Sequence, residues 1–90
     1  MREHLESDLG TAAFLIVRGF RLLGLVPNGS GRYAFRFEDG GEKAGGTAMA
    51  YLQGATVSAR ALMDAQKTLK TLLYSRKNGD RNGTTNRNRR

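Results

Sequence analysis

The residues most suited to binding chemistry lie on a predicted helix that starts after Ser58 and runs to about Tyr74. At about 100° per residue, its leucines occupy one face, and its cations form a separate stripe that also contains Tyr74. Such a stripe can neutralise phosphates, so the pattern favours a non-specific nucleic-acid contact. The alternative is a solvated face whose charge is incidental and keeps the protein soluble.

The predicted nucleic-acid interface joins this stripe to the basic C-terminal segment. Its members are Arg60, Lys67, Lys70, Lys77, Arg81, Arg87, Arg89 and Arg90. Three arginines on the water-facing side of a predicted sheet would extend the footprint: Arg21, Arg32 and Arg36. An arginine-rich arm adds salt-dependent affinity for any polyanion, but the same segment can equally be a terminus without a role.

A glycine-rich segment is the candidate for nucleotide chemistry. Gly40, Gly45 and Thr47 match a phosphate-binding loop, but Gly46 stands where that loop needs a lysine. Asp39 and Glu42 could meet a cation loosely, although a charged loop explains them as well. We therefore expect a surface loop here, with no cofactor and no metal.

Catalysis has few candidate residues in this chain. His4, Ser7 and Asp8 are close in sequence, but a triad is a spatial arrangement held by a scaffold. The chain has no cysteine, which excludes a thiol nucleophile and a cysteine-based zinc site. We expect a non-enzymatic protein without a small-molecule substrate.

The elements that must position these residues begin with a short extended segment over residues 2–6, in which Leu5 is expected to point inward. Ser7 or Asp8 then caps a helix, because either side chain can accept from the first-turn amides. Gly19 is expected to end that helix in the left-handed conformation. Its apolar stripe comprises Leu9, Ala12, Ala13, Ile16 and Phe20.

A hairpin is predicted next. Residues 20–26 are apolar and short enough for a strand, residues 27–31 have the composition of a turn, and residues 32–38 alternate strictly. One face of the second strand is aromatic and expected in the core: Tyr33, Phe35 and Phe37. The other face is charged: Arg32, Arg36 and Glu38.

After a loop over residues 38–46, residues 47–53 are expected to form a short helix. Its apolar positions are Ala48, Met49 and Leu52. The long helix then completes the order β-α-β-β-α-α. This order predicts an α+β fold in which helices pack on one face of a small antiparallel sheet.

Charge and apolar residues are distributed in opposite ways along the 90-residue chain, whose net charge is +7. All 19 Leu, Ile, Val and Phe residues lie within residues 1–75, whereas residues 76–90 hold six basic residues and one acidic residue. A segment with nothing to bury cannot offset the entropy of ordering. We expect one domain over residues 1–75 and a disordered basic tail over residues 76–90.

A domain of this size is marginal on its own, which favours a second functional class. In that hypothesis the protein is an interaction or assembly module, such as a homodimer, and its surface charge is incidental. No apolar run reaches membrane-spanning length, and no signal peptide opens the chain. A cytoplasmic protein without a membrane contact is therefore expected.

Four segments carry a resemblance to known sequences: residues 7–15 (SDLGTAAFL), 19–24 (GFRLLG), 32–39 (RYAFRFED) and 69–74 (LKTLLY). Together they are similar to a family of short prokaryotic proteins of unknown function, over about residues 7–74. The Gly45–Gly46 pair and the Asn/Arg-rich tail depart from that family. The resemblance implies the domain boundary near residue 75 and carries no known activity.

Overall fold

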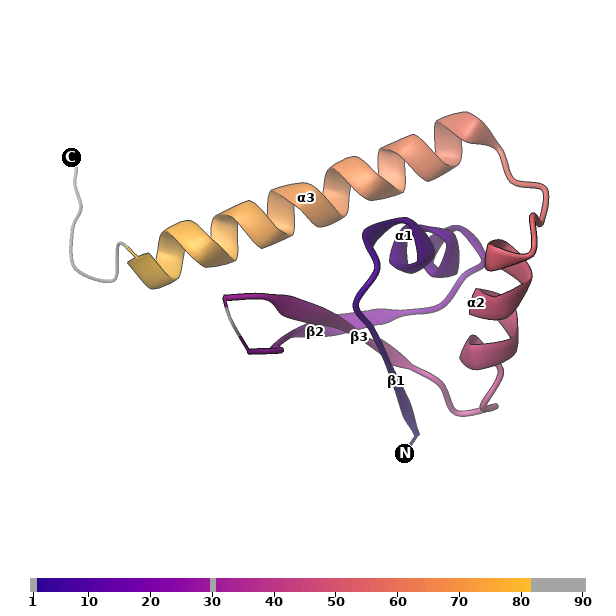
Figure 1. Cartoon of the computed structure of the whole chain (residues 1–90), viewed down its shortest axis with the longest axis horizontal. Helices are drawn as coiled ribbons and strands as arrows, with labels where there is room; N and C mark the ends of the chain where they lie inside the picture. Colours follow the sequence, from indigo (N-terminus) through magenta and orange to yellow (C-terminus); the bar gives the residue numbers. More distant parts are fainter. Residues whose placement is uncertain (1, 30, 82–90) are drawn as a thin grey trace.

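The computed structural model describes residues 2–29 and 31–81, with side chains as far as Arg76. Its elements follow the predicted order: β1 (Glu3–Glu6), α1 (Leu9–Val17), β2 (Leu22–Pro27), β3 (Tyr33–Glu38), α2 (Ala44–Leu52) and α3 (Ala59–Arg81). The three strands form an antiparallel sheet in the order β1-β3-β2. Helix α1 lies between this sheet and α3, which confirms the predicted α+β packing (Figure 1).

The sheet takes its register from β3, the central strand. Phe35 and Phe37 are almost fully buried in the cluster that also contains Leu15 and Leu69, while Tyr33 is half-buried at the hairpin end. The aromatic face of the hairpin is therefore the core face, as its alternation predicts. Strand β2 begins two residues later than expected, and a bulge between Leu22 and Gly24 interrupts its pairing.

Strand β1 corrects one prediction, because Leu5 points away from the core. Leu5 pairs with Arg36 on the outer face of the sheet and is 56% exposed. His4 pairs with Phe37, and Glu6 with Phe35, so these two polar side chains face the helices instead. The register of an edge strand is set by the strand it pairs with. A shift of one residue moves every side chain of the edge strand to the opposite face of the sheet.

Helix α1 has the expected ends. Asp8, rather than Ser7, is its N-cap, and the Asp8 carboxylate accepts from the backbone N–H of Thr11 at 2.9 Å and from the Thr11 hydroxyl at 2.8 Å. Gly19 follows the helix with φ of +95°, the left-handed conformation that glycine adopts without strain.

Helix α2 starts at Ala44, earlier than predicted, so Gly45 and Gly46 belong to a helix and not to the expected loop. Its buried residues are Ala44 and Ala48. Met49 and Leu52 are 52% and 67% exposed, so the expectation that they form the buried face is wrong. Small alanines let α2 approach α1 closely, while the larger Met49 and Leu52 extend into solvent.

Helix α3 is capped by Ser58, whose hydroxyl accepts from the backbone N–H of Ala61 at 3.2 Å. The helix continues to Arg81, beyond its expected end near Tyr74. Residues 76–81 of the predicted tail are thus helical, and residues 82–90 lie outside the described residues. Among the helices that the structure describes, none is both long and apolar enough to cross a membrane.

Candidate nucleic-acid interface

The predicted basic stripe lies on the exposed side of α3. The buried side of the helix is formed by Ala65 and Leu69, which are 7% and 0% exposed. Five exposed residues lie within about 80° of one another on the opposite side. We call them the α3 stripe: Arg60, Met63, Lys67, Lys70 and Tyr74. At about 1.5 Å per residue, the stripe extends for about 21 Å along the helix.

The charges of the α3 stripe are not neutralised locally. The ion pairs found among the described side chains involve Arg2, His4 and Arg36, and none of them includes a stripe residue. Asp64 is the nearest acidic residue on the helix and lies about 40° from Arg60. The stripe therefore presents three cations to solvent.

Two uncharged side chains on the α3 stripe are unusually exposed for their size. Tyr74 is 69% exposed and Met63 is 66% exposed. The sequence pattern predicted Tyr74 on the stripe but not Met63. Met63 could have been predicted, because a residue three positions after Arg60 lies on the same face of the helix. A surface with both cations and apolar groups can contact phosphates and the faces of bases.

The far end of α3 rests on the hairpin. The guanidinium of Arg76 lies 5.6 Å from the centre of the Tyr33 ring, within the range of a cation–π contact. Lys77 and Arg81 are on the helical backbone of α3, but their side chains are outside the described part. The predicted contacts Arg87, Arg89 and Arg90 lie outside the described residues altogether.

The structure brings one of the three sheet arginines close to α3. Arg32 lines a cavity together with Leu73 of α3. Arg36 lies on the outer face of the sheet, away from the helices, where its guanidinium pairs with Glu3 at 2.8 Å. Arg21 lies at the opposite end of the hairpin, where its carbonyl oxygen accepts from the backbone N–H of Glu38.

That cavity lies beside α3 and has a volume of about 310 Å³. We call it the hairpin cavity. It lies among the β1–α1 junction, the hairpin turn and the second half of α3, and its lining residues are Ser7, Leu9, Asn28, Gly31, Arg32, Tyr33, Phe35 and Leu73. Sequence reasoning missed it, because residues from three separate segments meet there and no segment carries a local signal.

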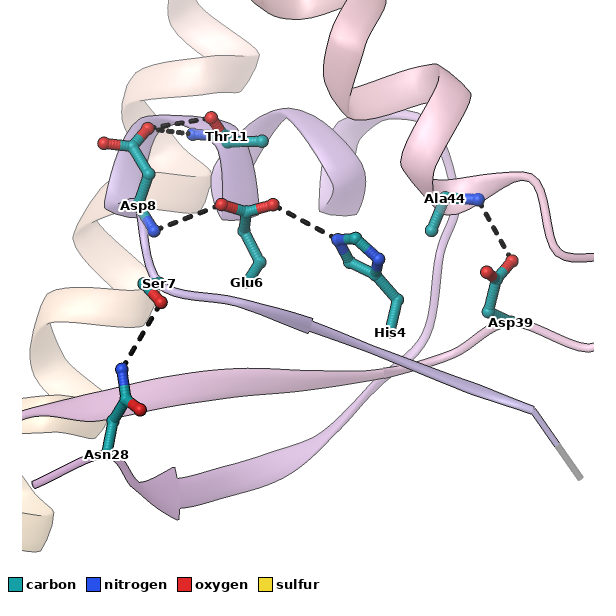
Figure 2. Close-up of polar contacts among 8 residues, drawn as sticks. All are labelled: His4, Glu6, Ser7, Asp8, Thr11, Asn28, Asp39 and Ala44. Atoms are coloured by element: carbon teal, nitrogen blue, oxygen red, sulfur yellow. Dashed lines mark hydrogen bonds and ion pairs between the residues drawn. The ribbon is translucent and has the colours of Figure 1, made fainter.

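The N-terminal polar residues make separate contacts and form no triad (Figure 2). The His4 ring contacts Glu6, with Nε2 at 3.2 Å from Oε1, and the other oxygen of Glu6 accepts from the backbone N–H of Asp8. The Ser7 hydroxyl instead accepts from the Asn28 side-chain amide at 3.4 Å. These residues fix the junction between β1 and α1.

The loop before α2 has a structural role. One oxygen of Asp39 accepts from the backbone N–H groups of Lys43 and Ala44, at 2.8 and 3.1 Å (Figure 2). The Glu42 carboxylate pairs with Arg2 at 2.9 Å. Within residues 2–29 and 31–81, no three His, Cys, Asp or Glu residues gather in a way that could hold a metal.

No protein-family model, curated protein or solved structure matches this chain. The resemblance to short prokaryotic proteins of unknown function therefore stays a prediction. The interpretation of the α3 stripe and the hairpin cavity depends on their geometry and charge.

Proposed function

We propose that the protein binds nucleic acid without catalysis, through the α3 stripe. The observation that carries this proposal is the row of three exposed cations, Arg60, Lys67 and Lys70, with no ion pair to a described residue. Each cation that neutralises a phosphate releases condensed counterions, which is the main source of non-specific affinity. The basic residues that follow Tyr74 in the chain add to the same field.

A change of two stripe charges tests this function. We expect Lys67→Gln with Lys70→Gln to weaken DNA binding by about tenfold at low salt, and to reduce the log–log salt slope by about two. The measurement is fluorescence anisotropy of a labelled DNA across a salt series, with the full chain.

The matched control removes two exposed cations that lie outside the predicted interface, by Arg2→Gln with Lys43→Gln. It lowers the net charge by the same amount, so we expect less than a twofold loss. An equal loss in both double variants would show that net charge, and not the stripe, produces the affinity. No binding by the unmodified chain near physiological salt would refute the function itself.

A second candidate function is assembly with another copy of the chain. It is favoured by Met49 and Leu52, which are three residues apart on α2 and both more than half exposed. Two such side chains are fewer than a stable interface usually requires, so this candidate has less support. The mass of the protein in solution tests it.

A further inference from the structure

The hairpin cavity has the features of a binding site for a small planar group. Its volume of about 310 Å³ is near the lower end of the range of about 300–1,000 Å³ that ligand pockets occupy. Half-buried Leu9 and Leu73 and buried Phe35 supply apolar walls. A single ring system suits this volume better than a larger ligand.

The polar groups around the cavity define the complementary ligand. Ser7 and Asn28 are exposed, and the long bond between them, at 3.4 Å, leaves the carboxamide oxygen of Asn28 without a described partner. These neutral groups can donate to and accept from the edge of a heterocycle. Arg32, also exposed and in no described ion pair, adds a positive charge that suits a phosphate.

The two carboxylates that flank the lining residue Ser7 in the sequence are held by other groups. Asp8 bonds Thr11, and Glu6 contacts His4 and the backbone of Asp8, so both carboxylates are engaged within the β1–α1 region (Figure 2). Among the described side chains that line the cavity, none is acidic. The surroundings thus favour a ligand that is planar and negatively charged.

We propose that the hairpin cavity takes one unpaired nucleobase of a single strand that lies along the α3 stripe, with Arg32 at the neighbouring phosphate. This proposal rests on the proposed function. It is supported by position, because Leu73 of the cavity lies about 60° around α3 and about 4.5 Å along it from Lys70 of the stripe. Leu73 is therefore next to the stripe on the surface of α3, so a strand that follows the stripe passes beside a wall of the cavity.

The proposal predicts a preference for single-stranded over duplex DNA. A base in a duplex must leave its stack and its pair before it can enter a pocket, which costs free energy that an unpaired base does not lose. We expect about tenfold tighter binding of a short single strand than of the duplex with the same sequence.

The experiment compares a labelled mixed-sequence DNA strand with its duplex by anisotropy, using the full chain. The test variant is Asn28→Ala with Arg32→Gln, and the matched control is Gln53→Ala with Lys43→Gln; all four side chains are exposed. We expect the test variant to lose most of the preference for single strands and the control to keep it. Amide NMR signals of Ser7, Asn28 and Leu73 should shift when the single strand binds.

The outcomes separate the two proposals. Equal affinities for strand and duplex, with unshifted signals at Ser7, Asn28 and Leu73, would overturn the cavity proposal and leave binding by the α3 stripe intact. A preference that survives in the test variant would also overturn it. If neither DNA binds, the proposed function fails, and the cavity proposal fails with it.

Discussion

The side chain of Asp39 caps the N-terminus of α2, although Asp39 lies four residues before Lys43, the N-cap position of the helix. Asp39 is 8% exposed, and its carboxylate accepts from two backbone N–H groups that have no partner within the helix. We expect Asp39→Ala to lower the free energy of unfolding by about 1–2 kcal/mol, because both donors lose their acceptor. Urea unfolding followed by circular dichroism measures this loss.

Asp39→Asn is the control for that prediction, since the amide keeps an acceptor oxygen and loses the charge. We expect it to retain part of the stability that Asp39→Ala removes, because the amide oxygen can still accept from both N–H groups. The lost charge accounts for the remainder, since a negative charge at a partly buried helix N-terminus contributes up to about 2 kcal/mol. Equal losses for the two variants would assign the stabilisation to charge and not to the hydrogen bonds.

Individual residues show where sequence reasoning succeeds and where it fails. The cap at Asp8 was predictable, because an N-cap and its helix are local in sequence. The inward position of His4 was not, because the register of β1 depends on β3, about thirty residues away along the chain. The start of α2 at Ala44 was not predicted, because Gly45 and Gly46 have poor helix propensity. In the structure, the hydrogen bonds from the first turn to Asp39 offset that propensity.

At the scale of elements, the packing of α1 against α2 depends on Gly10. A Cβ atom at Gly10 would lie 2.8 Å from the Tyr51 hydroxyl, and the Tyr51 ring packs against Phe14 with 5.0 Å between ring centres. We expect Gly10→Ala to destabilise the protein by about 1–2 kcal/mol, because the clash outweighs the gain in helix propensity. Thermal or urea unfolding measures the difference.

The same contact gives a double-mutant test. Tyr51→Phe removes the hydroxyl that the new methyl group would meet, so Gly10→Ala should become neutral or stabilising by up to about 1 kcal/mol in that background. If Gly10→Ala costs the same with Phe as with Tyr at position 51, the close approach of α1 and α2 is not its cause.

Elements also explain how much of the candidate site was predictable. The α3 stripe follows from helical periodicity, so the positions of Lys67 and Lys70 could be deduced before the fold was known. The hairpin cavity could not, because Ser7 and Leu73 meet only when β1, the hairpin and α3 are assembled. Local patterns indicate faces of elements, whereas cavities depend on how those faces are joined.

At the scale of the whole molecule, positive charge is concentrated in the C-terminal part of the sequence, in α3 and the residues that follow it. The molecule measures 44 × 31 × 21 Å, and α3 runs along its longest direction (Figure 1). The 19 Leu, Ile, Val and Phe residues all precede Arg81, so a chain that ends at Arg81 keeps every one of them. Its fold should be unchanged, while Arg87, Arg89 and Arg90 are removed.

A comparison of this shortened chain with the full chain separates the folded contribution to binding from that of the last nine residues. If the three arginines contact phosphates together with the α3 stripe, the magnitude of the log–log salt slope should fall by about two to three, and affinity should remain measurable at low salt. Anisotropy across a salt series reports both quantities. Complete loss of binding would show that the C-terminal residues bind DNA as a general polycation and that the α3 stripe does not contribute to the affinity. An unchanged slope would place the phosphate contacts within residues 1–81, and the Lys67→Gln with Lys70→Gln variant would then show whether α3 makes them.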